Sequence, residues 1–110
     1  MVALTEQNRA ALTQLCQHYR VERLYVFGSA VSGRFDAAHS DLDFLVCFAD
    51  RQPNSEYAAR HLGFAEDLEQ LFRRPVDLLT EQSIRNPYLR QEIESTRKLV
   101  YEQPHPETAV

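Results

Sequence analysis

Two aspartates at alternate positions, Asp41 and Asp43, are the residues of this sequence best suited to chemistry. They open a run that is apolar as far as Phe48 and is typical of a central β-strand. Side chains alternate along a strand, so both carboxylates share one face, with Cα atoms about 6.6 Å apart. Neighbouring acids repel each other and resist burial. The pair therefore indicates a divalent cation, with a strand end that simply faces water as the alternative.

A third carboxylate, Asp77, lies in the short apolar run Val76-Asp77-Leu78-Leu79. A charged residue in such a strand needs a partner. The alternatives to a cation are a salt bridge to Arg73 or Arg74 and a position at the solvent end of the strand. If this strand lies beside that of Asp41, the three carboxylates converge. Such a cluster is typical of two magnesium ions about 3.5–4 Å apart.

The third feature is Gly28-Ser29, which follows the β-rich run from Leu24 to Phe27. Glycine allows a sharp turn and the close approach of a ligand. Free backbone amides after the turn, together with the serine hydroxyl, would cradle a phosphate. Because Gly-Ser alone is an ordinary turn, its significance comes from the combination with the acids.

The elements that must position these residues follow from the hydrophobic pattern. The 110 residues are 44% hydrophobic, which suits one domain. We expect an α/β (α+β) fold, with a small mixed sheet of three to four strands and helices packed on it. The predicted order is helix 5–19, strand 24–27, loop 30–40, strand 41–48, helix 55–73, strand 76–79, a helix from residue 87 and an edge strand at 99–101.

The long second helix is expected to bury one apolar face, made of Ala58, Leu62, Ala65, Leu68, Leu71 and Phe72. The domain is expected to span residues 1–102, followed by a flexible tail at 103–110 that contains two prolines.

The composition narrows the class of function. A formal net charge of -4 argues against a general nucleic-acid binder, although it does not exclude a nucleotide as substrate. No apolar run approaches the roughly 20 residues of a membrane span, and no signal peptide is visible, so we expect a cytoplasmic protein. Cys16 and Cys47 are expected to be reduced, buried thiols, with a disulfide as the alternative.

The pattern resembles a known family. Phe27-Gly28-Ser29, followed after residues 30–40 by Asp41-Leu42-Asp43, resembles the signature of the DNA polymerase beta-like nucleotidyltransferase superfamily. Arg74-Pro75-Val76-Asp77 resembles the start of the strand that carries the third carboxylate. At this length the chain resembles the minimal nucleotidyltransferases, which are the antitoxin halves of bacterial toxin–antitoxin pairs with a HEPN-type ribonuclease toxin.

The resemblance implies a metal site and a nucleotide site. Asp41 and Asp43 would bridge two Mg²⁺ ions, and Asp77 would complete the inner metal site and help to draw the proton from an acceptor hydroxyl. Gly28 and Ser29 would bind the β- and γ-phosphates of ATP.

Arg34 is the further candidate for the triphosphate. The family's Arg-Gly pair after Gly-Ser is replaced in this chain, where Ser32 and Gly33 precede Arg34.

The implied function is transfer of AMP from ATP to a hydroxyl, a tyrosine of the cognate HEPN-type toxin, with pyrophosphate as the leaving group. The protein would then act as the antitoxin in a hetero-oligomer, with no direct binding of nucleic acid and no membrane. Two alternatives stay open. One is a catalytically silent antitoxin that neutralises its partner by binding alone, and the other is a nucleotidyltransferase that acts on a small molecule.

Overall fold

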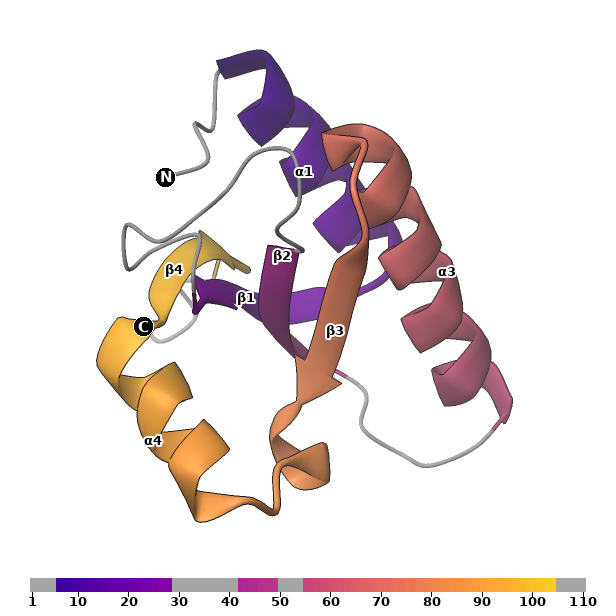
Figure 1. The fold of residues 1–110 in the computed structure, drawn as a ribbon. Helices are drawn as coiled ribbons and strands as arrows, with labels where there is room; N and C mark the ends of the chain where they lie inside the picture. Colours follow the sequence, from indigo (N-terminus) through magenta and orange to yellow (C-terminus); the bar gives the residue numbers. More distant parts are fainter. Residues whose placement is uncertain (1–5, 29–41, 50–54, 105–110) are drawn as a thin grey trace, which may run out of the picture.

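A computed structural model describes residues 6–28, 42–49 and 55–104 of the chain. The elements are α1 (Glu6–His18), β1 (Val21–Phe27), β2 (Leu42–Phe48), α3 (Ser55–Phe72), β3 (Val76–Thr80), the 3-10 turn η1 (Glu81–Ser83), α4 (Pro87–Thr96) and β4 (Lys98–Glu102). Figure 1 shows α1 and α3 together on one side of the strands and α4 apart from them. The predicted order of helices and strands is confirmed, with η1 as an addition, whereas the predicted loop 30–40 lies outside the described residues.

The four strands form one sheet in the order β3-β2-β1-β4. β1 is antiparallel to both β2 and β4, whereas β2 and β3 are parallel. Parallel neighbours need a crossover connection, and α3 supplies it. The expected mixed sheet is therefore confirmed, with β2 in its interior and β4 at one edge.

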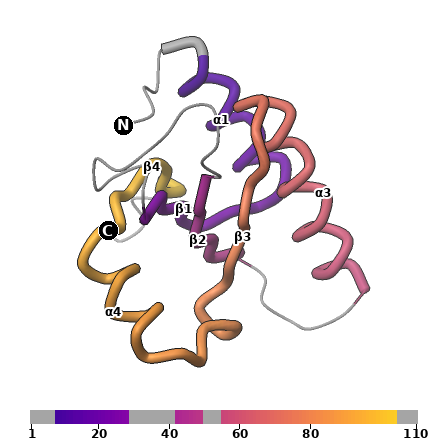
Figure 2. The backbone as a smooth tube through the Cα atoms, in the orientation of Figure 1, coloured from indigo at the N-terminus to yellow at the C-terminus, as the bar shows by residue number. Residues whose placement is uncertain are grey.

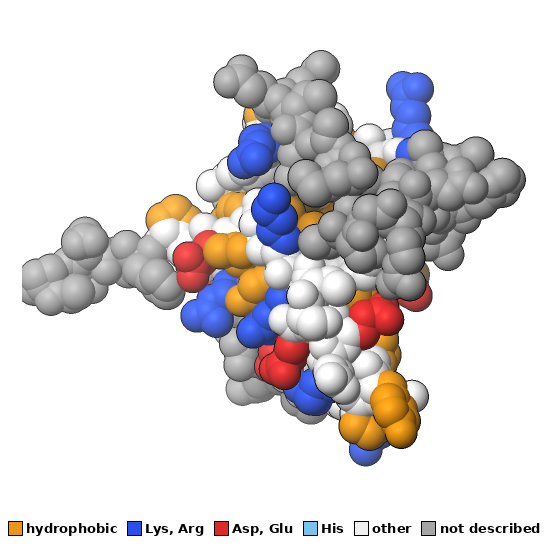
Figure 3. Space-filling view, turned by 60° about the vertical axis from the view of Figure 1, so that its left-hand side comes forward, with side chains coloured by type: hydrophobic (Ala, Val, Ile, Leu, Met, Phe, Trp, Pro, Cys, Tyr) orange, Lys and Arg blue, Asp and Glu red, His pale blue; other side chains and the backbone are white. Residues whose placement is uncertain are grey.

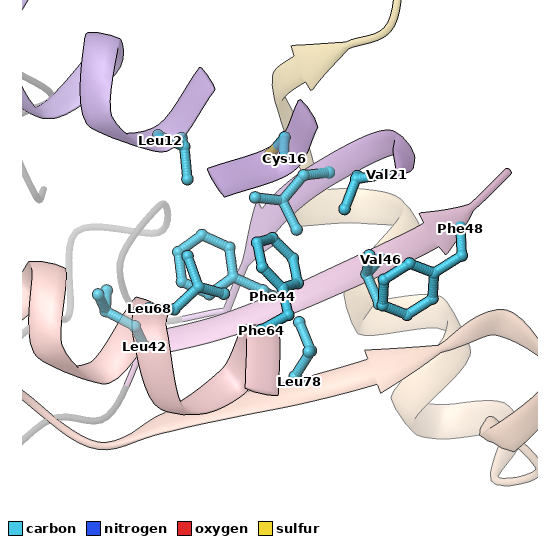
Figure 4. Packing of buried hydrophobic residues seen from close by; sticks show 11 residues of the cluster. Leu12, Cys16, Val21, Leu42, Phe44, Val46, Phe48, Phe64, Leu68 and Leu78 are labelled. Carbon is cyan, nitrogen blue, oxygen red and sulfur yellow. The ribbon is translucent and has the colours of Figure 1, made fainter. Parts of the chain in front are cut away.

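The main core lies between the sheet and the pair α1 and α3. Alternate residues of β2 point toward these helices, because successive side chains of a strand point to opposite faces of the sheet. Figure 4 shows them meeting side chains from both helices. The buried members of this cluster are Leu12, Cys16, Val21, Leu24, Leu42, Phe44, Val46, Phe48, Phe64, Leu68 and Leu78.

The predicted inner face of α3 is partly wrong. Ala58 and Leu62 are exposed, Leu62 with 61% of its surface, whereas Phe64 is fully buried beside Leu68. The inner face of α3 is centred on Phe64 and Leu68, which are four residues apart and therefore lie on the same side of the helix. The Phe64 ring fills the centre of the core, with its centroid 5.4 Å from that of Tyr19. The predicted face left out Phe64, although its large aromatic side chain is the most buried of the helix together with Leu68.

A second, smaller core lies on the opposite face of the sheet. Phe27, Leu45, Ile84 and Ile93 form it. Ile93 is the residue of α4 that is buried there, with 2% of its surface exposed. Figure 2 shows α4 on the side of the sheet away from α1 and α3. In the described part of the chain, α4 and the end of η1 cover this face.

The first residues of α4 and β1 differ in how well they were predicted. α4 begins at Pro87 as predicted, and Asn86 caps it by accepting hydrogen bonds from the amides of Tyr88 and Leu89. β1 begins at Val21, earlier than predicted, directly after Arg20 in a left-handed conformation with φ 56°.

Neither cysteine forms a disulfide, which agrees with the expectation of reduced thiols. Cys16 is buried, but Cys47 is only half-buried. Within the described residues, no helix has both the length and the apolar character needed to cross a bilayer.

Candidate active site

Asp43 and Asp77 face each other across neighbouring strands. In the parallel pairing of β2 with β3, the Cα partners are Asp43 and Asp77. Paired residues of neighbouring strands point to the same face of a sheet, and the strands lie about 4.8 Å apart. That face is the one with Leu45, because Asp43 and Leu45 are two residues apart on β2. The two carboxylates therefore lie together on the α4 side, as the sequence predicted.

Gly28 adjoins this acid pair. Phe27 is the partner of Asp43 in the antiparallel pairing of β1 with β2, so Gly28 follows at the point where the pairing ends. Its φ is +77°, and a Cβ added there would come within 2.8 Å of Asp43 Oδ2. Two separate reasons therefore favour glycine at this position: the left-handed conformation and the close contact with the Asp43 carboxylate. The turn predicted to bind phosphate begins beside the predicted metal ligand.

Helix α4 contributes two residues that the sequence analysis missed. The Gly28 amide donates a hydrogen bond to Thr96 Oγ1 at 3.0 Å. Glu92 Oε2 lies 3.8 Å from the point where a Gly28 Cβ would be. Both residues are next to the face of α4 that buries Ile93, so the helical spacing alone could have placed them near the sheet. Their residue types carried no signal for a role at this site.

The remaining predicted site residues, Ser29, Arg34 and Asp41, lie outside the described residues. Among the residues that are described, no three histidine, cysteine, aspartate or glutamate side chains gather closely enough to hold a metal ion. The structure therefore brings together Asp43, Asp77 and Gly28, and the third acid of the prediction stays a prediction.

The two described acids fit a hard divalent cation. Asp43 is half-buried and Asp77 is exposed, so both have a route to solvent and to a ligand. The alternatives for Asp77 were a salt bridge to an arginine at the end of α3 and a position at the solvent end of the strand. Its exposure agrees with the second of these. Within the described part of the chain, no ion pair joins Asp77 to Arg73 or Arg74. Paired carboxylate oxygens on one open face are ligands of the kind that Mg²⁺ prefers.

The comparisons with known proteins bear on this geometry. A model of the nucleotidyltransferase domain family matches residues 9–100. The chain belongs to the nucleotidyltransferase domain family. A protein of Methanocaldococcus jannaschii named "putative protein adenylyltransferase" is 36% identical over 76 residues, which cover 69% of this chain and 73% of that protein.

Solved structures share the nucleotidyltransferase fold. One described as a "putative minimal nucleotidyltransferase" is 29% identical and covers 84% of this chain and 88% of its own, with a TM-score of 0.65. A toxin–antitoxin complex with AMP-PNP matches at 22% identity, over 90% of this chain and 75% of that chain, with a TM-score of 0.63.

A further structure holds the tri-AMPylated HEPN toxin of Shewanella oneidensis in complex with its MNT antitoxin. It matches at 22% identity over 89% of this chain and 72% of that chain, with a TM-score of 0.59. At these identities the two complexes support the fold alone. The expected polymerase beta-like fold of minimal nucleotidyltransferases is therefore confirmed.

The nucleotidyltransferase also has a polar cavity of about 260 Å³ on the face of the acids. Arg97, which follows α4, crosses it with its guanidinium 4.7 Å from the Tyr25 ring centroid and 3.8 Å from Glu81 Oε1. Cys47 and Gln82 also line the cavity. Figure 3 shows basic and acidic side chains interspersed over the side of the molecule that carries α4 and β4. Among the described residues, side chains of both charges therefore lie on this side of the molecule.

Proposed function

We propose that this nucleotidyltransferase transfers AMP from ATP to a tyrosine hydroxyl of a cognate HEPN-type toxin and thereby acts as its antitoxin. The observation that carries the proposal is the pairing of Asp43 with Asp77 beside Gly28. The names of relatives support the class of reaction and of partner, because they include a protein adenylyltransferase and complexes of toxins with antitoxins.

The proposed reaction exchanges one phosphorus–oxygen bond for another. The acceptor oxygen attacks the α-phosphorus of ATP, and the bond from that phosphorus to the β-phosphate bridging oxygen breaks. Asp77, which is exposed at the start of β3, accepts the proton of the attacking hydroxyl. AMP is thereby joined to the acceptor, and pyrophosphate leaves.

Three acids would hold the metal in this proposal. Asp43 and Asp77, with Asp41, would bind two Mg²⁺ ions, which supply neutralisation of the triphosphate charge and polarisation of the α-phosphoryl group. Gly28 begins the turn that brings backbone amides toward the phosphates, and Ser29 and Arg34 are the proposed further contacts. Phosphoryl transfer depends mainly on the alignment of the reactants and on neutralisation of their charge, and these groups are of the types that provide both.

A macromolecular acceptor suits the exposed position of Asp77. Among the described residues, helix α4 and the turn η1 cover the second core, and Asp77 lies exposed on the same face of the sheet. A hydroxyl presented by another protein could approach Asp77 from that side.

The test is transfer of label from α-³²P-ATP in the presence of Mg²⁺ and the toxin encoded beside the antitoxin gene. Asp43→Asn and Asp77→Asn should each lower the rate by at least about 10²-fold, since even indirect supports of metal ligands cost 10–100-fold. Glu66→Gln is the matched control, because this exposed acid lies on α3 and therefore on the other side of the sheet. Chelation of Mg²⁺ should abolish transfer in the wild type.

The same variants separate catalysis from simple binding. Cells that carry the toxin should lose protection with the double variant Asp43→Asn/Asp77→Asn. Full protection by that variant, with no label on the toxin in vitro, would contradict the proposal and establish neutralisation by binding alone. Label on a small alcohol in the absence of any protein would instead identify a small-molecule transferase.

A further inference from the structure

We infer that Thr96 is a positioning residue, whose hydroxyl fixes the Gly28 turn against the Asp43 carboxylate. The expected effect of Thr96 on AMP transfer rests on the proposed function. The expected effect of Thr96 on the position of Gly28 rests on the contacts of these residues alone. The Gly28 amide donates to Thr96 Oγ1 at 3.0 Å across 68 positions of sequence.

The Thr96 hydroxyl has a fixed polarity. Its own proton is donated to the Glu92 carbonyl oxygen at 2.7 Å, one helical turn back. The Thr96 oxygen is therefore left as an acceptor, which is what an amide requires. A hydroxyl held in this way has no freedom to rotate its proton toward Gly28.

The hydrogen bond from Gly28 to Thr96 is needed because the backbone pairing of β1 with its neighbouring strands ends just before Gly28. The last paired residues of β1 are Phe27, with Asp43 on one side, and Val26, with Lys98 on the other. Gly28 is buried and follows both pairs, so its amide needs a partner from outside the strands. Thr96 is placed to supply it, because it ends α4 two residues before β4 begins.

The helix that carries Thr96 is itself anchored. Ile93, one turn before it, is buried with Phe27 and Leu45. Thr96 therefore joins a fixed helix end to a glycine whose missing Cβ allows the 2.8 Å approach to Asp43 Oδ2. Loss of the bond should loosen Gly28 relative to the acid, and with it the entry to the turn proposed to bind the triphosphate.

The experiment compares Thr96→Val, which keeps the shape but lacks the acceptor, with Thr96→Ser, which keeps the hydroxyl. Ser95→Ala is the matched control, because the Ser95 hydroxyl also donates to the Glu92 carbonyl, at 3.1 Å, yet has no contact with Gly28. If Thr96→Val does not fold, Thr96→Ala replaces it.

The first readout is hydrogen exchange of the Gly28 amide, followed by NMR. Exchange should be about 2- to 10-fold faster in Thr96→Val and close to wild type in Thr96→Ser and Ser95→Ala, as expected for loss of one hydrogen bond. Exchange in Thr96→Val equal to that in Ser95→Ala would overturn the inference, whatever the activity.

The second readout is AMP transfer. The KM for ATP should rise by about 2- to 10-fold in Thr96→Val with a smaller change in kcat, and Thr96→Ser should restore it. Faster Gly28 exchange with an unchanged KM would show a purely structural bond and would also overturn the positioning role. Absence of transfer in the wild type would instead contradict the proposed function, while the exchange pattern would still decide whether Thr96 fixes Gly28.

Discussion

Asp43 and Asp77 are paired residue to residue across the parallel strands β2 and β3. Their register places both carboxylates on the α4 side, beside the glycine that ends β1. Asp43 is paired with Phe27 of β1 on one side and with Asp77 of β3 on the other, so the sheet itself fixes the positions of Asp43 and Asp77.

Replacement of Gly28 by alanine should destabilise the fold and disturb the acid pair. A non-glycine residue in the left-handed conformation costs about 1–2 kcal/mol, and the added Cβ would also press against Asp43 Oδ2. Urea denaturation should show a loss of at least this size in the free energy of unfolding.

The double variant Gly28→Ala/Asp43→Ala isolates the steric part. Removal of the Asp43 carboxylate eliminates the clash but leaves the backbone strain, so the two losses should be less than additive. Strict additivity would show that Gly28 and Asp43 do not touch.

The corrected face of α3 predicts unequal costs for two leucines six residues apart. Leu68 is fully buried, and Leu68→Ala should lower the free energy of unfolding by about 2–5 kcal/mol. Leu62 is 61% exposed, and Leu62→Ala should change it by less than about 0.5 kcal/mol. Similar losses in chemical denaturation for both variants would support the face that was first predicted.

Tyr19 should make stability fall at high pH. Its hydroxyl donates to Asp67 Oδ2 at 2.6 Å. This bond, burial and the negative charges of Asp67 and Glu66 raise the pKa of Tyr19 from 10.0 to about 12. Since the folded state holds the proton more tightly, the contribution is complete below pH 10 and is lost as the pH rises through 12.

Tyr19→Phe is the variant that measures this contribution. It should cost roughly 1 kcal/mol at pH 8, and the gap to the wild type should shrink as the pH approaches 12. Denaturation curves at pH 8, 10 and 11 provide the comparison. A gap that stays constant over this range would show that the pKa of Tyr19 is ordinary.

The two thiols should differ sharply in reactivity. Burial raises the pKa of the Cys16 thiol from 9.0 to about 12, which lowers its thiolate fraction at pH 8 roughly a thousandfold. Cys47 is half-buried and lines the polar cavity. Iodoacetamide should therefore modify Cys47 in the native protein and Cys16 only after unfolding. Mass spectrometry of Cys47→Ser should find no native label, and label on Cys16 would refute the buried position.

The interior position of β2 and the edge position of β4 could be predicted from their hydrophobic patterns. The meeting of Asp43 with Asp77 was predicted only on the condition that their strands are neighbours, and the parallel pairing of β2 with β3 meets that condition. The inner face of α3 could not be predicted as reliably. Two adjacent stripes of the helix were both apolar, and the shape of the Phe64 ring in the core decided between them. Helical spacing could have placed Glu92 and Thr96 near the sheet, but their approach to Gly28 depends on how α4 packs against the end of β1, which the spacing does not predict.

The route of the chain between the two acids has a consequence for the lifetime of the protein. Asp43 and Asp77 are joined through the whole of α3, so a cation shared by them would act as a reversible cross-link across a long loop. An unfolded chain has no such site, and bound metal would therefore shift the balance away from the denatured ensemble. Resistance to proteases should then follow the supply of divalent metal.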